Sequence, residues 1–229
     1  QTCALPISND VGRRRLVAVP GLSLTPIYGF LAVKFNANAV LLAVWPWAGW
    51  AFLAALRSPT LARGAVLGAF LALAMLSKYV SAVLVIGMIV VVLLDPERRR
   101  LIVSPAAIAA AVVGLALFAP HVVHLAATGW TTIAYADHQA AETTGQFLSY
   151  ALRFPLSQVL FQLPILVALL VALPIADWHG LRALFDLSDL GRRRVAGLTL
   201  FPFLAMTGLG TLEWAKLTSQ WGFPLWFSS

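Results

Sequence analysis

The segment LALAMLSKYVSAVLVIG, residues 71–87, places one lysine, Lys78, in the middle of an apolar run. The run extends over residues 64–94, and basic residues flank it on both sides. Its 31 residues would form a helix of about 46 Å at 1.5 Å per residue, whereas the hydrocarbon core of a bilayer is about 30 Å thick. We therefore predict a hairpin of two short helices that turns near Ser77, Lys78 and Tyr79, with Lys78 at its tip rather than at the membrane centre.

The composition agrees with a membrane location. Of the 229 residues 60% are hydrophobic and only 11% are charged, whereas about a quarter of the residues of a soluble domain are charged. The net charge of +7 does not indicate a nucleic-acid partner, because the arginines form short groups between apolar segments. A single cysteine, Cys3, excludes an intramolecular disulfide framework and a cysteine-based metal site.

The arginine groups predict the topology. Under the positive-inside rule all four groups lie in the cytoplasm, so each apolar stretch between two groups crosses the membrane an even number of times. We expect an all-α, polytopic transmembrane bundle of about six membrane-spanning helices in short hairpins. The groups are residues 13–15, 57 and 63, 98–100, and 182 with 192–194; the apolar stretches are 16–56, divided at 34–38, then 64–94, 101–118, 156–175 and 195–209, with an outer segment at 120–155.

Lysines and arginines are distributed differently. The three lysines, Lys34, Lys78 and Lys216, all fall at predicted outer tips, while every arginine except Arg153 falls inside. Lysines at a membrane surface often only extend their ammonium group to the interface. A hairpin tip between apolar flanks needs no lysine, however, so we expect Lys78 to bind an anionic group such as a phosphate.

Further polar residues share the predicted outer face. His121 and His124 are three residues apart on one helical face and could ligate a metal, but no third ligand has convincing spacing, so a structural or hydrogen-bonding role is favoured. The chain has no Walker-type glycine loop, GxSxG, CxxC or HExxH motif, which removes most support for a hydrolase or an ATPase. The outer-face candidates are Asn36, Asn38, Tyr79, His121, His124, Asp137, His138 and Lys216.

The two ends of the sequence carry their own expectation. Residues 1–8, QTCALPIS, resemble a translated sequencing adapter, and an apolar segment begins near Trp226. We expect a non-native leader at 1–8 and a single transmembrane domain at 9–229 that is truncated at both ends.

Three segments resemble the GT-C superfamily of membrane glycosyltransferases, in the branch that contains protein O-mannosyltransferases and the aminoarabinose transferase of lipid A. They are TPIYGFLAVKFNANAVLLAVWPW at 25–47, GAFLALAMLSKYVSAVL at 68–84 and APHVVHLAATGWTTIAYADHQ at 119–139. The helix that ends in LSKY is the most specific of the three. The resemblance covers most of the chain after residue 20.

This resemblance implies an inverting glycosyltransferase that takes a sugar from a polyprenyl-phosphate carrier. The sugar passes to a lipid, glycan or protein acceptor on the outer face, which in a bacterial inner membrane faces the periplasm. Lys78, with Tyr79 and Lys34, is then expected to bind the donor phosphate, and His121 is similar to an outer-face histidine of related enzymes. The family's acidic base would lie N-terminal to this sequence, Asn38 stands where relatives often carry Asp, and a divalent cation stays an open cofactor.

Two other functions stay open. A secondary transporter or lipid flippase would use the outer lysines to bind an anionic solute or headgroup, but it would place ionisable groups near the membrane midplane. A non-catalytic membrane scaffold would leave the separation of lysines from arginines unexplained.

Overall fold

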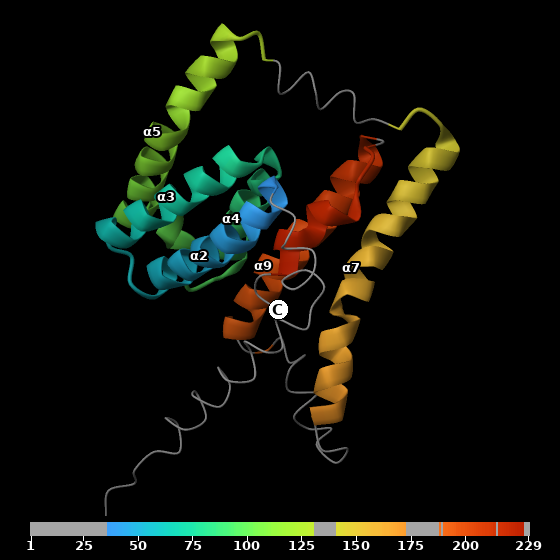
Figure 1. Ribbon diagram of the computed structural model, residues 1–229. Helices are drawn as coiled ribbons and strands as arrows, with labels where there is room; N and C mark the ends of the chain where they lie inside the picture. The colour runs from blue at the N-terminus through green and yellow to red at the C-terminus, as the bar shows by residue number, and fades with distance from the viewer. Residues whose placement is uncertain (1–35, 131–140, 173–187, 189, 214, 227–229) are drawn as a thin grey trace, which may run out of the picture.

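A computed structural model describes residues 36–130, 141–172, 188, 190–213 and 215–226. The described chain is helical (Figure 1), with short 3-10 helices (η) at two of its connections and near its end. The elements are α2 (Ala37–Arg57), α3 (Leu61–Ser77), η2 (Tyr79–Ser81), α4 (Ala82–Leu94), η3 (Arg99–Val103), α5 (Pro105–Ala127), α7 (Thr144–Ala172), α9 (Leu190–Leu212) and η4 (Ser219–Trp226).

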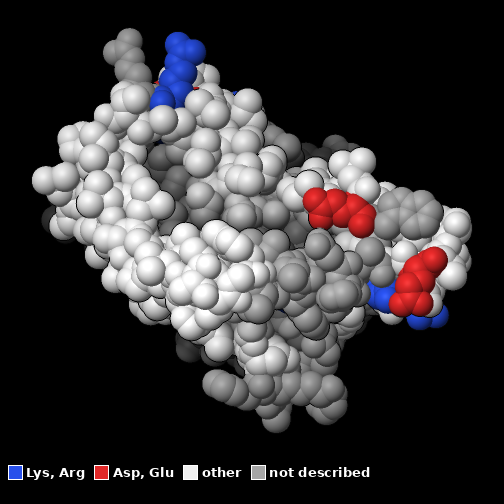
Figure 2. All heavy atoms as spheres, turned by 90° about the horizontal axis from the view of Figure 1, so that it is seen from above, with Lys and Arg blue, Asp and Glu red and all other residues white. Residues whose placement is uncertain are grey.

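The helices confirm the predicted membrane bundle. In the part of the chain that the structure describes, α2, α5 and α9 are long and apolar enough to cross a bilayer, and α3 and α4 are shorter apolar helices. Large apolar side chains such as Leu115 and Leu204 are exposed on these helices, as expected for surfaces in contact with lipid. Figure 2 shows one face of the molecule on which most of the surface is uncharged.

The turn at Lys78 lies where the sequence predicts it. Helix α3 ends at Ser77, Lys78 is in an extended conformation, and η2 leads directly into α4. The two helices do not form a closed hairpin, however: α3 packs against α2 and α5, whereas α4 packs against α9. Glycines explain this choice of partners, because a Cβ at Gly64 or Gly68 would overlap the backbone of α5 at Ala106 or Ala110.

Two helices extend beyond their predicted bounds. Helix α5 continues through Pro120 to Ala127, and α7 begins at Thr144 and contains Pro155 and Pro164. The sequence-based prediction instead ends one span at residue 118, begins the next at residue 156 and places an outer segment at 120–155. Proline is tolerated inside such helices where neighbours satisfy the freed carbonyl groups.

The chain alternates between two ends of the bundle. We call the end with Arg57, Arg63, Arg98, Arg99 and Arg194 the arginine end, and the end with Asn38, Lys78 and His121 the lysine end. At the arginine end, Arg194 of α9 forms an ion pair of 2.7 Å with Asp95, the residue after α4. At the lysine end, Lys78 after α3 meets Asn38 at the start of α2. The predicted separation of Lys78 from these arginines is confirmed.

Candidate functional site

The turn that carries Lys78 is fixed by a buried hydrogen-bond network. Ser81 is fully buried, and its hydroxyl donates to the Ala74 carbonyl at 2.9 Å and accepts from the Trp45 indole at 3.1 Å. The backbone N–H of Lys78 also donates to Ala74, at 3.0 Å. These bonds tie α2, the end of α3 and the start of α4 together, so the backbone at Lys78 is held in one conformation. The sequence analysis did not identify Trp45 or Ser81, although a serine after the LSKY motif in an apolar segment was the available signal.

Two asparagines at the start of α2 provide the hydrogen-bond acceptor for Lys78: Asn38 accepts the bond, and Asn36 caps the helix that carries it. Asn36 caps α2, because its side-chain oxygen accepts from the backbone N–H groups of Asn38 at 2.9 Å and Ala39 at 3.1 Å. Asn38 is buried in the first turn of α2, and its side-chain oxygen accepts from Lys78 Nζ at 2.9 Å. The cap therefore fixes the helix start from which Asn38 holds the ammonium group.

An aromatic ring is the second partner of Lys78. Trp221, in η4, lies with its ring centroid 4.3 Å from Lys78 Nζ. This separation is within the range of a cation–π interaction. Sequence reasoning missed Trp221, because no local pattern links it to a turn so far away in the chain.

The charge of Lys78 has no counter-ion in the described part of the chain. None of the carboxylates placed there lies within 4.0 Å of its ammonium group. Burial lowers the pKa of Lys78 from 10.5 to about 8, since the turn is partly shielded from solvent. The ammonium form still dominates at neutral pH, and its partners among the described residues are an amide oxygen and an aromatic face. Such a group is a suitable donor to an anionic ligand.

Tyr79 and His121 form a neighbouring pair. The Tyr79 hydroxyl and His121 Nε2 are hydrogen-bonded at 2.6 Å, and the ring of Phe118 lies 5.5 Å from that of His121. This contact joins the turn to α5. His124 is exposed and does not join the pair. Among the residues described, no group of three His, Cys, Asp or Glu could hold a metal ion.

The remaining candidates lie elsewhere or outside the described residues. Lys216 forms an ion pair of 3.1 Å with the exposed Glu142, so its charge is compensated. Lys34, Asp137 and His138 lie outside the described residues. The structure thus brings together Asn36, Asn38 and Lys78, and Tyr79, the residue after Lys78, is paired with His121 of α5.

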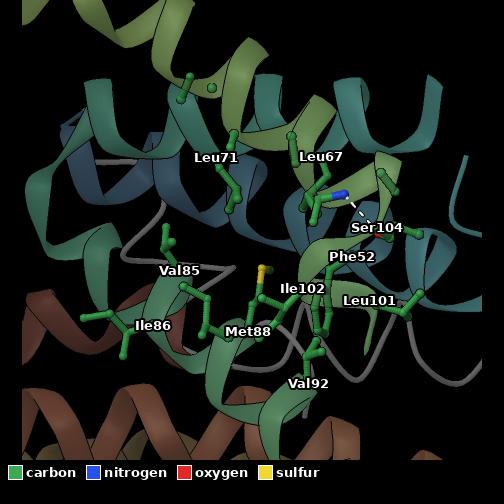
Figure 3. A pocket seen from close by; sticks show the side chains of 18 of the residues that line it. Phe52, Leu67, Leu71, Val85, Ile86, Met88, Val92, Leu101, Ile102 and Ser104 are labelled. Carbon is green, nitrogen blue, oxygen red and sulfur yellow. Dashed lines mark hydrogen bonds between the residues drawn. The ribbon is translucent and has the colours of Figure 1, made fainter. Parts of the chain in front are cut away.

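An apolar pocket separates α3 from α4 (Figure 3). Its volume is about 670 Å³, and its walls come from α2, α3, α4, η3 and α5. Labelled side chains such as Leu71, Val85 and Met88 point into it from both sides. The pocket reaches from Leu101 and Ser104 at the arginine end to Ala82 and Phe118 at the lysine end. One end therefore adjoins the Tyr79–His121 pair, because Phe118 contacts His121.

Comparison with known proteins gives one family. Residues 12–124 match the family described as dolichyl-phosphate-mannose-protein mannosyltransferase. The comparisons with curated proteins and with solved structures returned no match. The matched region contains α2, α3, α4 and most of α5, and with them Lys78, Asn38 and His121. Over residues 12–124 the chain is therefore similar to a family of mannosyltransferases.

Proposed function

We propose that the chain transfers a sugar from a polyprenyl-phosphate carrier and that Lys78 binds the phosphate of this donor. The observation that carries the proposal is the state of Lys78: a largely charged ammonium group, fixed on a rigid turn, with only neutral partners among the described residues. A phosphate would supply the missing negative charge. The family match supports a phosphate-linked sugar as the substrate class.

The apolar pocket supports a lipid-linked donor. A polyprenyl chain is a branched hydrocarbon, and the pocket between α3 and α4 has almost entirely hydrocarbon walls. Its end at Phe118 and Ala82 is next to the turn that carries Lys78. In such a complex the phosphate would pair with the Lys78 ammonium group, and the isoprenoid chain would pack against the apolar walls of the pocket.

Lys78 would assist the reaction through charge. When the sugar leaves its carrier, negative charge grows on the phosphate, and a positioned ammonium group stabilises that charge more in the transition state than in the ground state. Asn38 and the Ser81 network hold Lys78 in place before the substrate arrives, so little reorganisation is needed. We propose inversion at the anomeric carbon, with a lipid, glycan or protein as acceptor.

The orientation in the membrane is part of this proposal. The arginine end lies in the cytoplasm by the positive-inside rule, and the lysine end faces outward, to the periplasm if the membrane is a bacterial inner membrane. A single cysteine at position 216, with Cys3→Ser, should react with a membrane-impermeant thiol reagent added to intact cells. Reaction only after the cytoplasmic side is opened would reverse the orientation.

The substitution Lys78→Met tests the donor site. The methionine keeps the length of the side chain but removes the charge, and we expect sugar transfer in membranes to fall about a hundredfold, as for loss of one preorganised electrostatic group. Binding of undecaprenyl phosphate to the protein in nanodiscs should weaken in parallel. Arg57→Gln removes one exposed charge at the opposite end and serves as the matched control.

Equal binding and transfer by Lys78→Met and the Arg57→Gln control would overturn the phosphate assignment. Protein level and monodispersity in detergent should be compared for both variants, because a folding defect would lower both readouts together. Lys78→Arg adds a further check, since it restores the charge but not the compact ammonium geometry.

A further inference from the structure

The C-terminal 3-10 helix η4 crosses the lysine end and is firmly anchored there. Pro224 and Leu225 are fully buried, and the carbonyl of Ser219 accepts a hydrogen bond of 2.9 Å from Gln158 Nε2. Gly222 lies so close to Gln158 that a Cβ would overlap the amide group of that side chain. Contacts with both α2 and α7 therefore determine where η4 sits.

This anchoring places one side chain of η4 on Lys78. Trp221 is half-buried against the core, and its ring centroid is 4.3 Å from Lys78 Nζ. On another side, the same ammonium group donates to Asn38 at 2.9 Å. Among the residues that the structure describes, the Trp221 ring and the Asn38 amide oxygen are thus the two partners of the Lys78 ammonium group.

The other titratable groups near this end are already engaged or lie apart. Tyr79 and His121 are hydrogen-bonded to each other, and Lys216 is paired with Glu142. Glu213, after α9, has no ion pair with Lys78. Within the described residues, the aromatic face of Trp221 is thus the electron-rich group that interacts with the Lys78 charge.

We infer that Trp221 is a positioning residue of the donor site, whose indole face holds the ammonium group of Lys78 in its charged form against Asn38. The inference deepens the proposed function and rests on it for the identity of the ligand. The interaction is a cation–π contact between the Lys78 ammonium group and the Trp221 ring, and such contacts are stronger at a partly desolvated site than at an exposed surface. The family match ends at residue 124 and does not reach η4.

The test lowers the electron density on the face of the Trp221 ring but keeps the shape of the side chain. Mono-, di- and trifluorotryptophan are introduced at position 221 by nonsense suppression, since fluorine withdraws electrons from the indole face without opening the site to water. The pH midpoint of Lys78 acetylation by trace acetic anhydride, measured by peptide mass spectrometry, reports the charged form. The matched control carries the same residues at position 47, because Trp47 is exposed and stacks on Phe70.

We expect the acetylation midpoint of Lys78 to fall stepwise with each fluorine, by about 0.5 to 1 pH unit in total, and to stay constant when position 47 is changed. Affinity for undecaprenyl phosphate at pH 8 should fall by about threefold over the same series. A midpoint that does not move with fluorination at position 221 would overturn the inference.

The acetylation measurement contains no lipid, so it separates this inference from the proposed function. If fluorination moves the midpoint but the wild-type protein fails to bind undecaprenyl phosphate, the Trp221–Lys78 contact stands and the proposed donor is wrong.

Discussion

Each end of the bundle holds a partly buried positive charge, but the two charges have different partners. At the arginine end, Arg194 is paired with the buried carboxylate of Asp95 at 2.7 Å. At the lysine end, Lys78 has an amide oxygen and an aromatic ring as partners, and no carboxylate of the described chain within ion-pair distance. At the arginine end the positive charge is neutralised by a carboxylate of the chain itself. At the lysine end a ligand could neutralise the charge of Lys78.

The pKa values express the same difference. For Asp95, burial raises the pKa of the carboxyl, but the hydrogen bonds and charge of Arg194 and the local backbone bonds outweigh burial and lower it below 3.8. For Lys78, burial lowers the pKa to about 8, and no carboxylate among the described residues lies within ion-pair distance. Folding therefore favours the charged form of Asp95 and disfavours the charged form of Lys78. A protein retains such a destabilised charge mainly where a function needs it.

The largest expected effect is on stability at the arginine end. Asp95→Ala leaves the half-buried Arg194 without its main counter-ion, and we expect the free energy of unfolding to fall by about 3 kcal/mol. Lys78→Met should instead raise it by about 1 kcal/mol, because the substitution removes a poorly solvated charge. Reversible unfolding in detergent micelles measures both values.

Glu97→Gln provides the control at the same end. Glu97 is 63% exposed and lies 3.9 Å from Arg194, so its removal should change the free energy of unfolding by less than about 0.5 kcal/mol. If Asp95→Ala is as mild as Glu97→Gln, the contrast between the two ends does not exist.

Asn38→Asp makes the lysine end resemble the arginine end. A carboxylate 2.9 Å from Lys78 Nζ would neutralise the ammonium group and repel a phosphate. We expect the affinity for undecaprenyl phosphate to fall about tenfold, which corresponds to about 1.4 kcal/mol. The family resemblance implies that relatives often carry Asp at this position, so unchanged or tighter binding would show that a neutral partner is not what makes Lys78 available.

Alkaline pH should separate binding from stability. Because the pKa of Lys78 is about 8 in the folded chain and 10.5 ordinarily, affinity for a polyprenyl phosphodiester should fall about threefold between pH 7.5 and 8.5 as the ammonium group loses its proton. Over the window from about 8 to 10.5 the unfolded chain binds more protons at this site, so the Lys78 contribution to stability rises with pH. The Asp95 contribution is complete above 3.8 and is lost only as pH falls through its lowered pKa.

Lys78→Met should abolish the alkaline loss of affinity, because the titrating group is then absent. An identical pH profile in wild type and variant would assign the titration to another residue.

How much of this could be predicted depends on the range of the interaction. The turn at Lys78 follows from an apolar run too long for one crossing, a local property of the sequence. The divergence of α3 and α4 does not, because it depends on the fit of Gly64 and Gly68 against α5, which is a tertiary contact. The sequence cannot specify such pairings between helices that are apolar on most sides.

The candidate site shows the same limit. Lys78, Asn36 and Asn38 stand out as polar residues in apolar surroundings, so they were predicted as candidates; the contact between Lys78 and Asn38, 40 residues apart, required the fold. Trp221 carries no such signal, because tryptophans are common along this chain and in membrane proteins generally. Lys216 was predicted as a further outer-face candidate, and only the structure reveals its pairing with Glu142.

The smallest expected effect distinguishes two roles for Tyr79. The sequence predicts that Tyr79 helps bind the donor phosphate, but its hydroxyl is hydrogen-bonded to His121 at 2.6 Å. If this pair only braces the turn against α5, Tyr79→Phe removes one hydrogen bond with a net value of about 0.5 kcal/mol, and affinity for undecaprenyl phosphate falls about twofold. If the hydroxyl leaves His121 to contact the phosphate, the loss should approach that of Lys78→Met, because bonds to an anion are stronger. Titration of both variants in nanodiscs at pH 7 therefore decides whether the lysine end binds its ligand through Lys78 alone or through the whole turn.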